Sequence, residues 1–262
     1  MKTLFKKLAV ASLGLALTAG GASASTLTFT VDETVVPGTA PFGDVFEAQK
    51  LNGGYDETLT INADFSFDAN AVAFFTGYFD IDDDPVGTGL SGCDFVSQCY
   101  QLYAVFTASG DVDPNTGVFS GGTGEVALYL DPDNDTTADP AATGAGTPTV
   151  NQGLADILLL SSSDLAQGFG TIVPGIGGFF DLTFINLVLT AFGQQYYPDL
   201  PLFNLATVVD GDFDEIPVPV IPDTYDLGGD LSAVFVPEPA SMALFGMALF
   251  GAGIAARRRR TE

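Results

Sequence analysis

The stretch TLTINADFSFD at residues 58–68 alternates strictly between polar and apolar side chains. The apolar positions are Leu59, Ile61, Ala63, Phe65 and Phe67, and the polar positions are Thr58, Thr60, Asn62, Asp64 and Ser66. A period of two residues places all the apolar side chains on one face of a β-strand. We therefore expect one half-buried strand over residues 58–68.

The same alternation recurs along the chain. It covers residues 100–108 and 125–130, where the apolar positions are Tyr100, Leu102, Ala104, Phe106, Ala108, Val126, Leu128 and Leu130. Residues 179–192 and 202–209 are more continuously apolar, as the central strands of a sandwich are. Glycine and proline separate these segments, which favours turns between strands.

Helical patterns are scarce between the two ends of the chain. Only residues 155–160 fit a helical turn, and no internal repeat has a fixed period. The sequence therefore predicts an all-β domain over residues 25–236, folded as an antiparallel β-sandwich or jelly roll.

The charge excludes several classes of function. The 262 residues include 33 acidic and 8 basic residues and no histidine, which gives a formal charge of −25. Without imidazole the chain has no Ser-His-Asp triad, no Cys-His pair, no histidine-containing zinc site and no haem histidine. A nucleic-acid partner is not expected, because the phosphates would be repelled. Lys50 is the only cation outside the terminal segments, and without residues 1–24 and 240–262 there are 32 acidic residues and one lysine, a formal charge of −31.

Residues 1–24 have the order of a secretory signal peptide. A lysine-rich start precedes an apolar run over residues 8–19, and Ala22-Ser23-Ala24 supplies the small residues that signal peptidase accepts. We expect signal peptidase to cut before Ser25 and the chain to be exported. A short buried helix is the alternative interpretation.

The two cysteines, Cys93 and Cys99, lie six residues apart. Export places them in an oxidising compartment, which favours a disulfide between them. A closed loop this short contributes about 2 kcal/mol in the chain-entropy model. The spacing is too wide for a Cys-x-x-Cys redox motif, so we expect a structural bridge.

Residues 237–262 form a distinct C-terminal segment. Pro237-Glu238-Pro239 is followed by an uncharged apolar stretch over residues 240–256 and then by Arg257, Arg258, Arg259 and Arg260. As a helix, the apolar stretch spans about 25 Å, close to the thickness of a membrane core. The arginines are expected to stay on the cytoplasmic side, with the acidic domain outside. The sequence thus predicts a C-terminal transmembrane helix.

The order of Pro-Glu-Pro, apolar helix and arginine cluster closely resembles the PEP-CTERM sorting signal of Gram-negative bacteria. The resemblance implies that an exosortase, a membrane-embedded cysteine transpeptidase, recognises Pro237, Glu238 and Pro239. It further implies transient anchoring in the inner membrane, followed by delivery to the cell surface or the extracellular matrix. A plain C-terminal membrane anchor is the alternative.

Acidic clusters are the only candidate ligand sites, and Ca²⁺ is the one cofactor that they suggest. One cluster contains Asp131, Asp133, Asp135 and Asp139, at positions 1, 3, 5 and 9 of a loop that lacks the glycine and the final glutamate of an EF-hand. A second cluster contains Asp210, Asp212 and Asp214, and a third surrounds residues 80–84. Solvated acidic turns that keep the protein soluble are the alternative for each.

Catalysis is not expected. Paired carboxylates are compatible with glycoside chemistry, so a secreted carbohydrate-active enzyme is the alternative function. The absence of tryptophan and the single lysine of the domain argue against it, because tryptophan is a common platform for sugars and cations hold anionic substrates.

Short pieces along most of the chain resemble the flocculation-associated PEP-CTERM proteins of the PepA type. They are residues 29–33, 36–38, 51–55, 129–132, 209–214 and 231–239. The resemblance implies a non-enzymatic extracellular matrix or surface protein that works with exopolysaccharide in flocculation or biofilm. Two routes to adhesion are compatible with it: bridging through Ca²⁺, or direct association of sheet edges and exposed aromatic side chains.

Overall fold

The computed structural model describes residues 26–38, 43–87, 89–90, 99–139, 149–173, 177–201, 205–213 and 221–237. In chain order the elements are β1 (Phe29–Asp32), the 3₁₀-helix η1 (Glu33–Val35), β2 (Val45–Ala48), β3 (Lys50–Ile61), β4 (Ser66–Phe79), β5 (Pro85–Val86), β6 (Gln101–Val112), β7 (Val118–Asp131), β8 (Thr137–Asp139), β9 (Thr149–Asn151), β10 (Ile157–Ser162), β11 (Asp164–Val173), β12 (Gly177–Ile185), β13 (Val188–Leu189), the short helix α2 (Gly193–Tyr196), β14 (Leu205–Phe213) and β15 (Asp223–Pro237).

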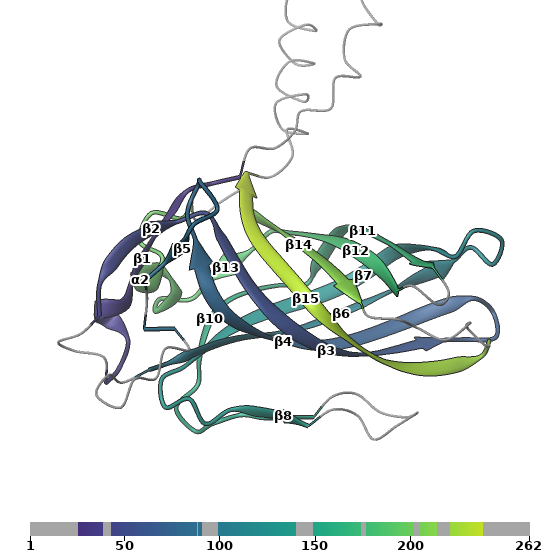
Figure 1. Ribbon diagram of the computed structural model, residues 1–262, viewed down its shortest axis with the longest axis horizontal. Helices are drawn as coiled ribbons and strands as arrows, with labels where there is room; N and C mark the ends of the chain where they lie inside the picture. Colours follow the sequence, from purple (N-terminus) through teal and green to yellow (C-terminus); the bar gives the residue numbers. More distant parts are fainter. Residues whose placement is uncertain are drawn as a thin grey trace, which may run out of the picture. The chain divides into compact units, whose positions relative to one another are not determined.

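Eight long antiparallel strands form one closed sheet (Figure 1). Their order is β11-β12-β14-β15-β3-β4-β6-β7, and β11 also pairs with β7, so the first strand joins the last. The all-β prediction is therefore confirmed, whereas the predicted sandwich or jelly roll is not confirmed, because the sheet closes on itself as an eight-stranded barrel.

Glycines make this closure possible. Gly121 of β7 is the register partner of Gly168 of β11. A Cβ atom added at Gly168 would lie 2.9 Å from the Cα atom of Gly121, and one added at Gly121 would lie 3.0 Å from the Cα atom of Gly168. Side chains at these positions would force the two strands apart, so the seam depends on glycine.

The stretch 58–68 is a hairpin and not the single strand that its alternation predicts. β3 ends at Ile61 and β4 begins at Ser66, and the register pairs Ile61 with Phe67. Phe65 has a φ of 66°, and its N–H donates to the Asn62 carbonyl at 3.0 Å. Because the paired residues Ile61 and Phe67 are an even number of positions apart, the apolar positions on both sides of the turn still face inward, so the alternation survives the reversal.

The other predicted segments have mixed outcomes. Residues 101–108 lie in β6 and residues 125–130 in β7 as predicted, with the apolar face buried, and Tyr100 directly precedes β6. Residues 155–160, which by sequence are compatible with a helical turn, belong largely to strand β10, which pairs with β7. So short an apolar run does not distinguish a helix from a strand.

The two continuously apolar segments also differ from expectation. Residues 179–192 do not form one strand, since β12 ends before Asn186, whose φ is 55°, and β13 and α2 follow. Within 202–209, residues 205–209 lie in β14 and residues 202–204 lie outside the described part.

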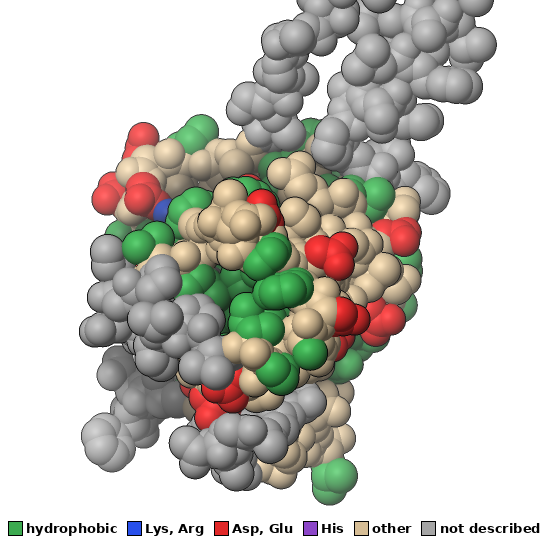
Figure 2. All heavy atoms as spheres, turned by 90° about the vertical axis from the view of Figure 1, so that its right-hand side faces the viewer, with side chains coloured by type: hydrophobic (Ala, Val, Ile, Leu, Met, Phe, Trp, Pro, Cys, Tyr) green, Lys and Arg blue, Asp and Glu red, His purple; other side chains and the backbone are tan. Residues whose placement is uncertain are grey.

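Inward-facing side chains of the eight strands fill the barrel with one hydrophobic core. The β3–β4, β6–β7, β11–β12 and β14–β15 connections lie at one end, here called the turn end. Figure 2 faces this end and shows hydrophobic side chains gathered in a hollow at its centre. A cavity of about 50 Å³ lies inside the barrel, and Glu57, Leu59, Phe67, Phe106 and Phe180 belong to its wall.

A buried tyrosine cluster lies at the opposite end, here called the plugged end. The Tyr196 hydroxyl is 3.0 Å from the Tyr78 hydroxyl and 2.6 Å from the Tyr100 hydroxyl. The Tyr78 hydroxyl is also 3.0 Å from the Tyr197 hydroxyl. Tyr100 also donates to Glu33 Oε1 at 2.8 Å. Polar atoms buried inside a protein need such partners, and here they are supplied by β4, η1, α2 with the residue after it, and the residue before β6.

The predicted signal peptide (1–24) and the C-terminal segment after Pro237 lie outside the described residues. In the part of the chain that is described, no helix is both long and apolar enough to cross a membrane. Cys99 accepts a 3.6 Å hydrogen bond from Asn134 Nδ2. Cys93 lies outside the described residues, so the pairing of the two cysteines stays a prediction.

Candidate functional site

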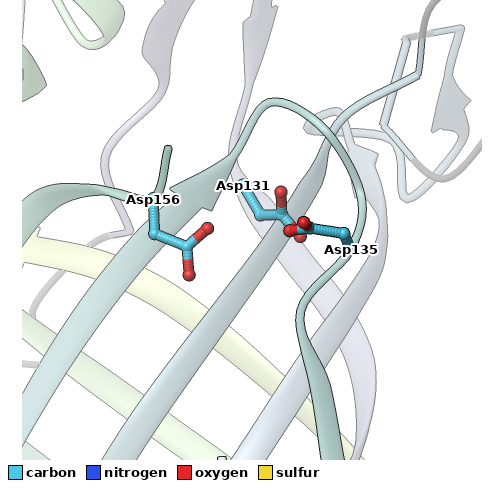
Figure 3. A group of neighbouring side chains, drawn as sticks. All are labelled: Asp131, Asp135 and Asp156. Atoms are coloured by element: carbon cyan, nitrogen blue, oxygen red, sulfur yellow. The ribbon is translucent and has the colours of Figure 1, made fainter. Parts of the chain in front are cut away.

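Three carboxylates converge beside the end of β7. Asp131 is the last residue of β7, Asp135 lies in the following turn, and Asp156 immediately precedes β10. Figure 3 shows Asp135 and Asp156 pointing from opposite sides toward Asp131. One oxygen from each carboxylate lies within 4.8 Å of the other two. Among the described residues, this is the one group of acidic or other metal-ligating side chains that meets so closely.

The loop folds around Asp131, which is fully buried. Its Oδ1 accepts from the N–H of Asp133 at 3.0 Å, and its Oδ2 accepts from the N–H of Thr136 at 2.7 Å. These bonds convert the side chain into the scaffold of the turn, as aspartates commonly do. The Asp135 carboxylate is thereby brought back toward the end of the strand.

Asp156 has two unlike oxygens. Its Oδ2 accepts from the Tyr103 hydroxyl at 2.7 Å and from the Thr136 hydroxyl at 2.8 Å. Its Oδ1 is buried and has no hydrogen-bond partner in the described structure. A Cβ atom at Gly153 would lie 2.0 Å from Asp135 Oδ1 and 2.9 Å from Asp156 Oδ1, so both oxygens face the same point beside this glycine.

The electrostatics of the cluster are unfavourable without a cation. Desolvation, together with the negative charges of Asp131, Asp133 and Asp156, raises the pKa of Asp135. Like charges held this close favour protonation or the binding of a positive ion. Carboxylate oxygens are the ligands that Ca²⁺ prefers, so the arrangement can hold a Ca²⁺ ion with Asp131, Asp135 and Asp156 as ligands.

This cluster overlaps only partly with the predicted loop. Asp131 and Asp135 come together as expected, but the Asp133 side chain is exposed and that residue contributes its N–H. Asp139 pairs with Thr149 through the backbone, and its side chain lies outside what the structure describes. Asp156 was missed by the sequence analysis. The signal for it is the register of β10 on β7, which pairs Ile157 with Leu130 and so places the preceding residue beside Asp131.

The second predicted cluster is spread along a strand. Asp210 and Asp212 are exposed residues of β14, and Asp181 of β12 is the register partner of Asp210. Desolvation, followed by the charge of Asp181, raises the pKa of Asp210. Asp214 lies outside the described residues. Within the described structure, these aspartates do not join a compact metal-ligating group.

The acidic turn at residues 80–84 holds itself together. Asp80 Oδ1 accepts from the N–H groups of Asp82 and Asp84, at 2.9 and 3.0 Å. Asp83 forms an ion pair with Lys50. The solvated-turn interpretation therefore fits this cluster.

Of the sorting tripeptide, the structure describes Pro237. It is the last residue of β15, is exposed, and pairs with Leu205 of β14. Glu238, Pro239 and the arginines at 257–260 lie outside the described residues. The folded barrel therefore extends as far as the first residue of the tripeptide.

Comparison with known proteins identifies this segment. Residues 235–260 match the family model for the PEP-CTERM protein-sorting motif. No curated protein and no solved structure matches the chain. The motif marks the protein as an exosortase-sorted surface protein, and it implies export and a surface or extracellular location.

Proposed function

We propose that this chain is a non-enzymatic extracellular matrix or surface protein that works with exopolysaccharide in cell aggregation, as the flocculation-associated PEP-CTERM proteins of the PepA type do. The observation that carries the proposal is the PEP-CTERM motif at residues 235–260. The predicted signal peptide at the other end of the chain supports it, because sorting by this route requires export.

The position of the motif suits processing of a folded domain. β15 pairs with β14 and β3 and ends at Pro237. Cleavage at or after the tripeptide removes the apolar stretch and the arginines and leaves all eight strands of the barrel in place. The expected order is transient anchoring in the inner membrane, processing by exosortase, and retention of the barrel in the polysaccharide matrix.

The fold argues against adhesion through the edges of the barrel sheet. Each of the eight barrel strands pairs with a neighbour on both sides, so the long strands of the described structure offer little free edge. Bridging through bound cations or through side chains on the outer face is therefore the preferred route. Ca²⁺ at Asp131, Asp135 and Asp156 is the cation site that we propose.

Processing is tested by intact mass in a host that contains an exosortase. The wild-type extracellular form is expected to lack residues 257–260, whereas the combined Pro237→Ala, Glu238→Ala and Pro239→Ala variant should remain in the membrane fraction. Glu47→Ala, at an exposed position on β2, is the control and should be processed normally. An extracellular product that retains the arginines contradicts the sorting proposal.

Aggregation is tested by deleting the gene and restoring it. We expect the deletion strain to settle more slowly and the wild-type gene, but not the triple variant, to restore settling. The viscosity of the purified exopolysaccharide should stay constant when the protein is added. A progressive loss of viscosity would support the carbohydrate-active enzyme instead.

A further inference from the structure

The outer face of β11, β12, β14, β15 and β3 carries a row of unusual side chains. Successive register partners place Phe169, Asp181, Asp210, Ser232 and Asn52 side by side across the five strands. One step along the strands, Phe179 lies opposite Asp212, and Asp230 lies opposite Gly54. An open groove lies over these residues.

Two aromatic rings stand at one side of this groove. Phe169 is 39% exposed and Phe179 is 51% exposed, and their ring centroids are 5.8 Å apart. Elsewhere in the barrel most phenylalanines are buried in the core, so a pair of exposed neighbouring rings is a departure from the pattern. Exposed aromatic faces that gain nothing for the fold are typical of binding surfaces.

The middle of the groove contains hydrogen-bond acceptors. Asp181 and Asp210 lie directly opposite each other, an arrangement that destabilises a sheet. Asp181 Oδ1 is buried and has no hydrogen-bond partner in the described structure. Burial raises the pKa of Asp181, in keeping with its partly desolvated position. Asp212 Oδ1 accepts one bond, from the N–H of Asp230 at 3.1 Å.

Gly54 lies at the floor of the groove, and packing does not require a glycine at this position. A Cβ atom at Gly54 would meet only the Gly229 carbonyl oxygen, at 3.6 Å, which is an ordinary contact. The fold therefore does not require glycine here, in contrast to the seam between β7 and β11. Its absent side chain leaves the groove unobstructed beside Asp230.

We propose that this face binds a neutral, hydroxyl-rich polysaccharide, with sugar rings stacked on Phe169 and Phe179 and sugar hydroxyls donating to Asp181, Asp210 and Asp212. Aromatic rings offer apolar faces to the C–H surface of a sugar. Carboxylates accept strong hydrogen bonds from hydroxyl groups. An anionic polymer does not fit, because the described side chains that line the groove include four aspartates and no cation. The inference rests on the proposed function in taking polysaccharide as the partner.

The test uses the full chain, purified in detergent, in affinity electrophoresis through gels that contain dextran, hydroxyethylcellulose or alginate. We expect at least one neutral polymer to retard the wild-type protein. The combined Phe169→Ala and Phe179→Ala variant should bind it roughly tenfold more weakly, because the stacking surface is lost. Gly54→Leu should block binding by filling the groove. Val188→Ala removes a side chain that is 65% exposed on β13 and is the matched control, expected to bind normally.

Circular dichroism melting verifies that each variant is folded before its binding is compared. No retardation by either neutral polymer, retardation by alginate alone, or unchanged binding by both groove variants would overturn the proposal. The assay needs neither exosortase nor cells. If processing and settling are normal but the protein binds no neutral polymer, the glycan-binding proposal is wrong and the proposed function is unaffected. If processing fails but binding is seen, the sorting proposal is wrong and the glycan-binding proposal is unaffected.

Discussion

Two buried glutamates, one toward each end of the barrel, have opposite surroundings. Glu33 at the plugged end is 2% exposed, and its Oε1 accepts from the Tyr100 hydroxyl at 2.8 Å and the Gly89 N–H at 2.9 Å. Glu57 is 9% exposed, faces the cavity, and forms no hydrogen bond with any residue that the structure describes. Similar burial therefore has different consequences, because the hydrogen-bond donors around a carboxyl group decide how it can exist inside a protein.

The difference appears in the titration of Glu57. Desolvation by burial raises the pKa of Glu57 to about 7. Its register partners are Ala71 of β4 and Leu227 of β15, so no neighbouring charge or donor offsets the cost of ionisation. At neutral pH both the protonated and the ionised form of Glu57 are therefore populated. Glu33, by contrast, accepts hydrogen bonds from Tyr100 and Gly89.

The largest expected effect is at the plugged end. Glu33→Ala leaves the Tyr100 hydroxyl and the Gly89 N–H without this acceptor, which should lower the free energy of unfolding by about 3 kcal/mol. Urea unfolding of the processed protein measures the loss. Glu47→Ala, at an exposed site on β2, is the control and should stay within about 0.5 kcal/mol of wild type. Equal stability of the two variants would remove the distinction between the glutamates.

Glu57→Gln tests the turn end through pH. A carboxyl group whose pKa rises from 4.5 in the unfolded chain to about 7 in the folded barrel binds more protons when folded. Its contribution is fully present below pH 4.5 and is lost as pH rises through 7, which amounts to about 3 kcal/mol. The wild type should lose this stability relative to Glu57→Gln between pH 4.5 and pH 8.

Unfolding at a series of pH values checks the difference between the two proteins, since general acidic repulsion affects both. Glu125→Gln, at an exposed site on β7, should follow the wild-type curve. Parallel curves for Glu57→Gln and wild type would contradict the burial of an unpartnered carboxyl group.

Asp156 combines the surroundings of the two glutamates. Its Oδ2 accepts hydrogen bonds, as Glu33 does, whereas its Oδ1 has no hydrogen-bond partner among the described residues, as is the case for Glu57. If Ca²⁺ occupies that position, it stabilises the barrel by about 2.7 kcal/mol at a hundredfold excess over Kd. Thermal melting with Ca²⁺, compared with Na⁺ at equal ionic strength, measures this. Asp156→Asn should abolish the excess stabilisation, and Asp133→Asn, at an exposed residue outside the converging group, should keep most of it. Loss of the Ca²⁺ effect in Asp133→Asn but not in Asp156→Asn would instead support the ligands predicted from the sequence.

The smallest expected effect concerns the tyrosine cluster that accompanies Glu33. Tyr196→Phe removes a hydroxyl that contacts those of Tyr78 and Tyr100, and should cost about 1 kcal/mol. Tyr129→Phe is the control, because its ring stacks on Tyr103 at 5.1 Å and no hydrogen bond of its hydroxyl is seen among the described residues. Urea unfolding separates the two, and equal stability would show that the network is not needed at the plugged end.

The inward and outward faces of the strands were largely predictable from the sequence, because a period of two survives a turn whose paired flanking residues, such as Ile61 and Phe67, are an even number of positions apart. The closure of the sheet into a barrel was not predictable, because it depends on the pairing of Gly168 with Gly121, which are 47 residues apart in the sequence. Asp131 and Asp135 were found because they share a loop. Asp156 requires knowledge of strand register, and Glu57 was overlooked although it continues the inward face of Leu59.

Lys50 gives the protein a further property. Between the predicted signal peptide and the arginine cluster at residues 257–260, it is the only residue of the sequence after which a trypsin-like protease can cut. Its backbone lies in β3, between Phe79 of β4 and Val234 of β15, and its ammonium group pairs with Asp83. A protease must bind an extended, accessible chain, and this one lies inside a closed sheet. The folded barrel should therefore persist among secreted enzymes of this specificity, an advantage for a protein that works outside the cell.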